Sequence, residues 1–375
     1  MNRKVAPPGL SATLDAAVAN NGYSAKDLTV LASQNDPFRV DTPARHRDGE
    51  WLAVQAAEHG LGDRRIHLRG LHYMLIGTGK PNGEPYTNTE EDWLWLQGHA
   101  GKAARWLGYL PFNQIVDARN AEPVIRILKR EEPSSYVNVG VDVDIPEIED
   151  IEPQVGIEGF AGVQPFKLVL FGEKSSLEDV LAPITSTYRA DLYLPTGEIS
   201  DTLLYRMASV GAEDGRPMIV LCLSDCDPSG WQMPISIARK LQGFRALEFP
   251  DLDFEVRRVA LMPEQVREHG LPSTPLKATE SRADKWQQKM GVEQTEIDAL
   301  ATLNPALLRR IVREALAPFF DQTLDRRVLE AESVWLQQAQ TALEERIDQG
   351  QLERLSSEAQ VKLDHAHVNL PRPAH

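Results

Sequence analysis

Two short apolar runs in the middle of the chain each end in acidic residues. The runs are LVLF at residues 168–171 and MIVLCL at residues 218–223. Uninterrupted apolar runs of this length are typical of strands that are buried on both faces of a parallel sheet. Glu173 follows the first run, and Asp225 and Asp227 follow the second. The pattern therefore predicts two core strands with carboxylates at their carboxyl ends.

Strand-like and helix-like segments alternate from residue 165 to about residue 320. In chain order they are KLVLF, SLEDVLAPITSTY, ADLYLP, SDTLLYRMASVG, PMIVLCLS, QMPISIARKLQG and FEVRRVAL. Regular alternation of this kind predicts an α/β fold built on a parallel sheet. From Asp325 onward the chain reads as one long charged helix with sparse apolar positions, which favours an interaction or packing arm.

The N-terminal third has a different pattern. Residues 1–48 are polar and interrupted by prolines, and one helix is expected from Ser11 to about Asn20. Three further segments follow: a helix near residues 49–59, a compact apolar unit at 64–77, and a helix at 88–108 with a strand-like return after it. Helices joined by a turn and closed by a short strand predict a winged-helix domain.

Charge is distributed unevenly along the 375 residues, whose formal net charge is −15. Residues 1–130 hold 16 Lys and Arg against 14 Asp and Glu, whereas the remaining residues hold 24 against 41. The run VDVDIPEIEDIEP at residues 141–153 holds six acids and no base, and is expected to be an interdomain linker or an exposed edge. The negative total does not exclude a groove for DNA that is lined by local basic residues. Binding of DNA in such a groove should depend strongly on salt concentration.

No apolar run approaches the length of a membrane span, and the first residues lack the apolar segment of a signal peptide, so no membrane association is expected. The two cysteines, Cys222 and Cys226, have neither a second Cys pair nor a His cluster nearby in the sequence. We therefore expect reduced thiols of a cytoplasmic protein rather than a zinc site.

The carboxylates after the two predicted strands form a candidate metal site. Asp225 and Asp227 are alternate residues and can point the same way, and Glu173 ends the other strand. Two carboxylates about 4 Å apart repel each other by roughly 4 kcal/mol at an effective dielectric constant near 20. A divalent cation with oxygen ligands, Mg²⁺ or alternatively Mn²⁺, relieves this repulsion. The structural alternative is that Glu173 is an acid of a first helical turn and that Asp225 and Asp227 cap the next helix.

A strand followed by Glu173, a helical spacer and a strand followed by the DCDPSG of residues 225–230 resembles the Toprim fold. The N-terminal unit resembles the winged-helix domain of the topoisomerase VI A subunit. There, RGLHY at residues 69–73 matches a motif with a catalytic tyrosine after an arginine. A branch of bacterial and mobile-element proteins is more similar still, in AARWLGYLPFNQIVDARN, in RVALMPEQVREHGLPSTPLKATESR at 258–282 and in EIDAL at 296–300. The resemblance covers residues 60 to 320.

Together with the residue patterns, the resemblance predicts a division into five parts: an N-terminal extension at 1–48, a winged-helix DNA-binding domain at 49–135, an acidic linker at 136–163, a Toprim domain at 164–320, and a helical arm and tail at 321–375. It also implies Mg²⁺-dependent cleavage of a DNA strand, in which Tyr73 becomes linked to a 5′-phosphate with Arg69 beside it. A homodimer is implied, and a separate ATPase subunit is a possible partner. For Tyr73, a place in the helical core is the alternative.

Two other functions remain open, namely a hydrolytic nuclease of a defence or mobile-element system that uses the same metal site, and a DNA-binding subunit without catalysis. The basic residues expected to contact DNA are Arg64, Arg65, Arg69, Lys102, Arg105, Arg119, Lys277 and Arg282. For Lys277 and Arg282, solvated surface charge is the alternative. Glu296 and Asp298 are either additional carboxylates of the metal site or a pair on a helix face, and we favour the helix-face pair.

Overall fold

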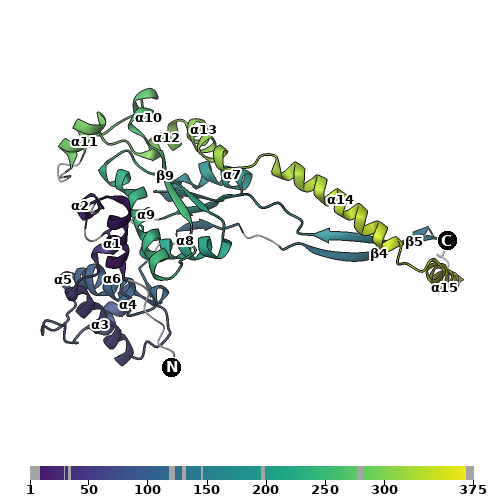
Figure 1. Ribbon diagram of the computed structural model, residues 1–375, viewed down its shortest axis with the longest axis horizontal. Coiled ribbons are helices and arrows are strands. Elements are labelled where there is room, and N and C mark those ends of the chain that lie inside the picture. The colour runs from purple at the N-terminus through teal and green to yellow at the C-terminus, as the bar shows by residue number, and fades with distance from the viewer. Residues whose placement is uncertain are drawn as a thin grey trace, which may run out of the picture. The chain divides into compact units, whose positions relative to one another are not determined.

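The computed structural model describes residues 9–28, 30–32, 35–117, 123–128, 132–144, 147–195, 199–276, 280 and 282–368. The chain forms two compact units (Figure 1). The first unit combines the residues up to Leu128 with Pro165–Phe320, and the second combines Lys129–Gln164 with Asp321–His375. Within the described residues, no helix combines the length and the apolar character needed to cross a membrane.

A five-stranded sheet lies at the centre of the first unit, in the order β3-β7-β6-β8-β9. Its strands are β3 (Val124–Arg126), β6 (Lys167–Gly172), β7 (Asp191–Leu194), β8 (Met218–Leu223) and β9 (Phe254–Ala260). All neighbours run parallel except β3, which is antiparallel to β7 at one edge. Every residue of β6 and β8 is buried, and the two strands pair directly. The predicted α/β class and the two predicted core strands are confirmed.

Helices cover both faces of this sheet (Figure 1). Leu168 and Leu170 pack on one face and Val169 and Phe171 on the other, because successive strand residues point in opposite directions. The first face is covered by α7 (Glu178–Tyr188), α12 (Ile297–Leu303) and α13 (Pro305–Leu316). The short helices α10 (Pro263–Glu268) and α11 (Ala283–Met290) each add a buried side chain to the same core. The second face is covered by α1 (Leu10–Asn21), α8 (Asp201–Asp214) and α9 (Pro228–Leu247).

The N-terminal helical part has a small core of its own, which includes Leu52, Leu71, Leu75 and Tyr86. Its helices are α2 (Ala25–Leu28), α3 (Pro43–Glu58), α4 (Leu68–Leu75), α5 (Glu90–Trp95) and α6 (Gly101–Trp106), and a π-helical stretch, Leu96–Ala100, joins the last two. Two short strands, β1 (Ile66–His67) and β2 (Ile115–Val116), pair in parallel. The helices expected near residues 11–20, 49–59 and 88–108 are thus present.

Buried contacts join this helical part to the sheet. The Trp106 ring stacks on Phe244 of α9 at 4.6 Å, and its Nε1 donates a 2.9 Å hydrogen bond to Asp201 of α8. Arg105 forms a 3.0 Å ion pair with Asp117, and Lys240 forms one of 2.7 Å with Asp201. Because these charges are paired and hydrogen-bonded, they can be buried between the helices and the sheet.

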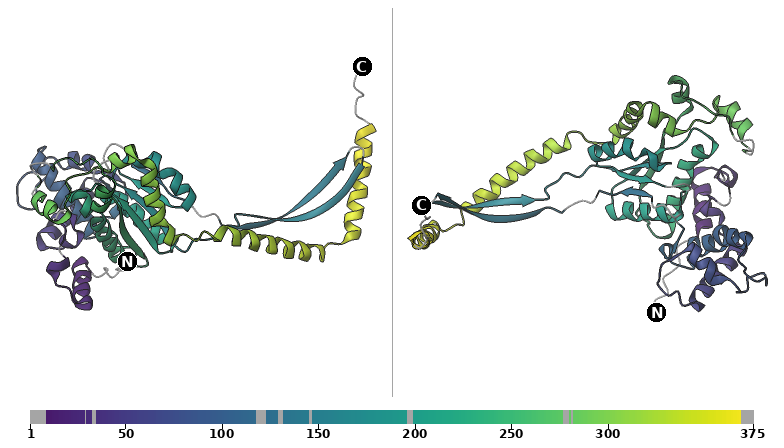
Figure 2. Two further views of the ribbon diagram at one scale, coloured as in Figure 1. Left: turned by 90° about the horizontal axis from the view of Figure 1, so that it is seen from above. Right: turned by 180° about the vertical axis from the view of Figure 1, so that it is seen from behind.

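The second unit consists of a long antiparallel pair, β4 (Ser134–Asp144) and β5 (Glu147–Glu158), with α14 (Leu324–Glu344) and α15 (Gln349–Val368). β5 lies against both helices (Figure 2). The expectation of a linker over residues 136–163 is wrong. Valines at 137, 139, 141 and 143 alternate with other residues, which is the period of a strand. Two helices, moreover, stand where one long charged helix was expected.

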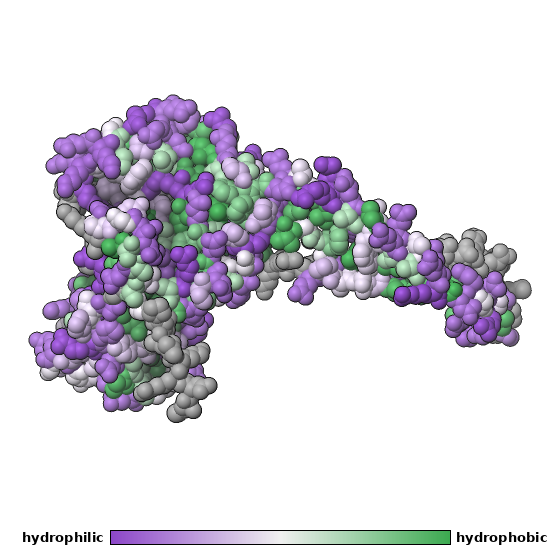
Figure 3. Space-filling model, viewed as in Figure 1, coloured by the Kyte–Doolittle hydropathy of each residue, from purple (hydrophilic) through white to green (hydrophobic). Residues whose placement is uncertain are grey.

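The second unit buries little apolar surface. Among its residues whose burial the structure describes, Leu324 is the one buried apolar side chain. An open groove of about 380 Å³ lies between the strands and α14, lined by apolar residues that include Tyr136, Val155 and Trp335. Figure 3 shows apolar surface over α14 and the strands. The arrangement depends on pairing of the strands and on packing of the helices rather than on a closed core.

Candidate metal centre

The predicted acidic residues lie where the strand order reverses. The chain leaves β6 through α7 and returns as β7 on one side, whereas it leaves β8 through α9 and returns as β9 on the other. A crevice forms at such a point beyond the carboxyl ends of the strands, and ligands of open α/β sheets bind there. Glu173 follows β6, and Asp225 and Asp227 follow β8. The topology thus brings together the residues that the sequence singled out.

Backbone hydrogen bonds fix these carboxylates. The backbone N–H of Asp225 donates to Glu173 Oε2 at 2.8 Å. Asp227 is the N-cap of α9, and its Oδ1 accepts from the backbone N–H of Gly230 at 2.6 Å, with Pro228 in the first turn. The capping role that was the alternative for Asp227 is therefore real, and it leaves the second carboxylate oxygen available for other ligands.

The acidic residues act on one another. Burial, followed by the charge of Asp225, raises the pKa of Glu173 to about 7, and Asp227 contributes in the same direction. Burial also raises the pKa of Asp225, although the Ile297 N–H and Lys174 oppose that rise. Carboxylates whose pKa values are raised by burial and by one another are a feature of functional sites, including sites that bind cations.

A distant segment completes the cluster. Cys226 and Thr295 form an isolated antiparallel bridge, and the backbone N–H of Ile297 donates to Asp225 Oδ1 at 2.8 Å. These bonds bring Glu296 and Asp298 beside the site. The two residues cap and begin α12, and both contact Lys174, which in turn contacts Asp225.

Lys174 was missed by the sequence analysis. Its Nζ lies 3.2 Å from Asp225 Oδ2, 2.9 Å from Glu296 Oε2 and 3.3 Å from Asp298 Oδ2. Burial lowers the pKa of Lys174, but the hydrogen bond to Glu296 and the charges of the two aspartates raise it by more. The one signal in the sequence was its position directly after Glu173.

Two arginines from other parts of the chain contact the start of α9. Arg258 stacks on the ring of Trp231 at 4.1 Å and donates to the backbone oxygen of Gly230 at 3.0 Å. Arg282, an expected DNA contact, donates to Ser229 Oγ at 3.2 Å and to Gln232 Oε1 at 2.9 Å. Glu280 holds the guanidinium of Arg282 from its other side. These contacts place Arg282 next to the candidate centre.

The donor set is suited to a hard cation. Glu173, Asp225 and Asp227 offer oxygen atoms only, as Mg²⁺ and Mn²⁺ prefer. Within the described part of the chain, no three Asp, Glu, His or Cys side chains are close enough to hold an ion as they stand. Glu173 and Asp227 each direct one oxygen to a backbone N–H, and the two oxygens of Asp225 are engaged by the Ile297 N–H and by Lys174. Their chemistry fits the ion, and their present orientation does not yet form its coordination shell.

Tyr73 lies on the exposed side of α4. Its side chain is 57% exposed, whereas Leu71, His72 and Leu75 on the same helix are buried. The alternative of a core tyrosine is therefore wrong. The Arg69 guanidinium lies 6.0 Å from the centre of the Tyr73 ring and 4.8 Å from that of Trp93, so the arginine and the phenol share one surface.

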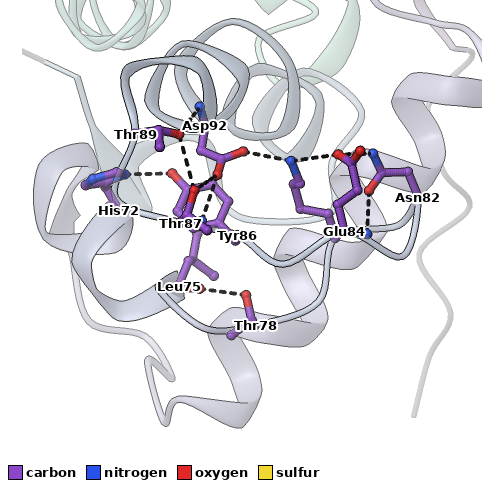
Figure 4. Close-up of polar contacts among 10 residues, drawn as sticks. His72, Leu75, Thr78, Asn82, Glu84, Tyr86, Thr87, Thr89 and Asp92 are labelled. Carbon is purple, nitrogen blue, oxygen red and sulfur yellow. Dashed lines mark hydrogen bonds and ion pairs between the residues drawn. The ribbon is translucent and has the colours of Figure 1, made fainter.

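A polar network joins His72, the neighbour of Tyr73 on α4, to the loop that follows the helix (Figure 4). His72 Nδ1 lies 2.7 Å from the Tyr86 hydroxyl. In the first turn of α5, Asp92 accepts from two residues of the preceding loop, from Lys80 at 2.7 Å and from the Thr87 hydroxyl at 2.6 Å. Burial alone would raise the pKa of Asp92, but these hydrogen bonds lower it to about 2. Tyr73 thus lies on the exposed side of a helix whose other side is hydrogen-bonded and packed.

The expected basic surface is smaller than the sequence suggested. Arg64 and Arg65 are exposed, as is Arg69. Arg105 is only 3% exposed and pairs with Asp117, so the expectation that it contacts DNA is wrong. Burial lowers the pKa of Lys102, which lines a small cavity beside Asp201 and Lys240. Arg119 and Lys277 lie outside the described residues.

No family model matches this sequence, and no curated protein matches it. Function is therefore argued from the site itself.

Proposed function

We propose that this protein cuts DNA strands with the help of a divalent metal ion, using Tyr73 as the nucleophile. The position of Glu173, Asp225 and Asp227 at the reversal of the strand order carries the proposal. The exposure of Tyr73 beside Arg69 supports it. The resemblance to the winged-helix and Toprim domains of the topoisomerase VI A subunit gives the same reaction.

In the proposed reaction, the phenolic oxygen of Tyr73 attacks the phosphorus of a phosphodiester and the bond to the 3′ oxygen breaks. The 5′-phosphate stays on the tyrosine, the 3′ oxygen takes up a proton, and the phenol gives up its proton to solvent. Arg69 orients a non-bridging oxygen. Mg²⁺ bound by Glu173, Asp225 and Asp227 would neutralise charge on the phosphate and the leaving oxygen. We also propose that the active form is a homodimer in which Tyr73 of one protomer serves the carboxylates of the other, with an ATPase as a separate partner.

A test compares four forms of the full chain on supercoiled DNA with Mg²⁺. They are the wild type, Tyr73→Phe, Asp225→Asn and Tyr23→Phe, and the last is the control because Tyr23 is also 57% exposed. Asp225→Asn keeps an acceptor for the Ile297 N–H while removing the charge. We expect DNA ends linked to protein with the wild type and Tyr23→Phe, and none with Tyr73→Phe or Asp225→Asn.

The oxygen-only donor set of Glu173, Asp225 and Asp227 also fits a second candidate, a hydrolytic nuclease. A divalent ion held by these carboxylates would lower the pKa of a bound water and so supply a nucleophile at neutral pH. In this case, cleavage survives Tyr73→Phe, is lost in Asp225→Asn and leaves no protein on the DNA. Binding of DNA without cleavage by any form would contradict both candidates and indicate a non-catalytic DNA-binding subunit.

A further inference from the structure

The candidate centre holds more carboxylates than one divalent ion needs. Besides Glu173, Asp225 and Asp227, it includes Glu296 and Asp298. Enzymes of phosphoryl transfer with so many acids commonly bind two metal ions about 3.5–4 Å apart. The number of ions at this centre therefore depends on what neutralises the second group of acids.

Lys174 occupies the middle of that second group. Its ammonium is within 3.3 Å of an oxygen atom of each of three carboxylates, those of Asp225, Glu296 and Asp298. An ammonium surrounded by three carboxylates has the position and the positive charge of a bound cation. Unlike a metal ion, it is part of the chain and does not have to lose bound water to take this position.

Further hydrogen bonds fix the carboxylates around Lys174. Asp298 Oδ1 accepts a 2.6 Å hydrogen bond from the Ser176 hydroxyl, so both of its oxygens are engaged. The Ile297 N–H engages the other oxygen of Asp225, and the bridge between Cys226 and Thr295 fixes the segment that carries Glu296. The lysine side chain is 26% exposed, which is low for a lysine at a surface.

We infer that Lys174 takes the place of a second cation, so that this centre binds one divalent ion rather than two. The inference rests on the proposed metal centre and adds its stoichiometry and the role of Lys174. Asp225 is shared between the two positions, since it contacts Lys174 and stands next to Glu173. A second divalent ion would have to enter beside a fixed positive charge, which opposes its binding.

The experiment counts Mn²⁺ ions bound to the full chain by calorimetry and by the paramagnetic resonance of free Mn²⁺. It compares the wild type with Lys174→Met, Lys174→Arg and Lys285→Met, in which an exposed lysine is the control. We expect one ion per chain for the wild type, Lys174→Arg and Lys285→Met, and two for Lys174→Met. Adding Glu296→Gln and Asp298→Asn to Lys174→Met should weaken the second ion by roughly tenfold or more.

The outcomes separate the two proposals. A wild type that binds no Mn²⁺ overturns the metal centre itself. Two ions in the wild type, or one in folded Lys174→Met, overturn the role of Lys174 and leave the centre standing. Metal-free Lys174→Met should melt at a lower temperature than the wild type, and Mn²⁺ should raise its midpoint more. If that variant does not fold, the wild type and Glu296→Gln with Asp298→Asn decide, since both are expected to bind one ion.

Discussion

Glu173 is the residue whose ionisation ties the metal centre to stability. Its pKa is about 7 in the folded chain, against about 4.3 for an ordinary glutamate. The folded state therefore binds the proton more tightly than the unfolded state does. The stabilising effect of this proton is complete below about pH 4 and is lost as the pH rises to 7 and above.

We accordingly expect the metal-free wild type to lose about 1–2 kcal/mol more than Glu173→Gln in its free energy of unfolding between pH 5 and pH 8, after allowance for solvent screening. The loss arises because the folded wild type must accept a charge that glutamine cannot carry. Urea unfolding in the presence of a chelator measures it at both pH values. Equal losses for the two proteins would contradict the raised pKa.

At this scale, the sequence predicted what is local. Glu173 and Asp225 could be placed at one edge because each lies within two residues of the end of a buried strand. Glu296 could not, since it is 122 residues away from Lys174 in the chain and is brought there by packing. The prediction that Arg105 contacts DNA was wrong for the same reason. One of the acids that pair with it, Asp201, lies on α8, far away in the sequence.

At the scale of elements, the turn from β8 into α9 controls the site. The chain turns so tightly after Asp225 that a Cβ at Gly230 would overlap the backbone carbonyl of Asp225. Glycine is required here by close approach of the backbone and not by an unusual φ. Helix α9 can thus begin directly beneath the carboxylates.

Gly230→Ala should lower the free energy of unfolding by about 3 kcal/mol, because the turn must open to admit the methyl group. It should also weaken Mn²⁺ binding, since Asp225 and Asp227 move with the turn. Gly98→Ala is the control: no atom lies within 4 Å of its added Cβ, and a gain of about 0.5–1 kcal/mol is expected in a helix. Thermal unfolding and Mn²⁺ titration measure both. A Gly230→Ala protein with unchanged metal affinity would contradict the link between turn and site.

The strands β4 and β5 show where sequence reasoning at this scale went wrong. Net charge drew attention to residues 141–153 and suggested an interdomain linker or an exposed edge, while the alternation of valines from 137 to 143 indicated a strand. The charge of a segment indicates whether it is exposed to solvent, whereas the period of its apolar residues indicates its backbone conformation. The alternating helices and strands of residues 165–320 were predicted correctly because both signals agreed there.

For the whole molecule, the negative charge of −15 limits where DNA can bind. With Arg105 buried, the exposed donors of the N-terminal part include Arg64, Arg65 and Arg69. If DNA runs over this surface, these side chains release counterions from phosphates.

Replacing Arg64 and Arg65 together by glutamate should weaken DNA binding similarly on all sequences and reduce the slope of log K against log salt by about 2. The control is Arg310→Glu on α13, whose side chain is 64% exposed. Fluorescence anisotropy over a range of salt concentrations measures both changes. An unchanged slope in the double variant would place the DNA surface elsewhere.

The composition of the second unit has a consequence for synthesis on the ribosome. The side-chain amide of Gln340 on α14 donates to the backbone oxygen of Pro153 on β5, a contact that spans 187 residues. At about 5–20 residues per second, the strands emerge roughly 10–40 s before the helix that packs on them. During that interval their edges are open to other nascent chains. We expect the six acids of residues 141–153 to disfavour pairing with strands of neighbouring chains in that interval, because like charges repel.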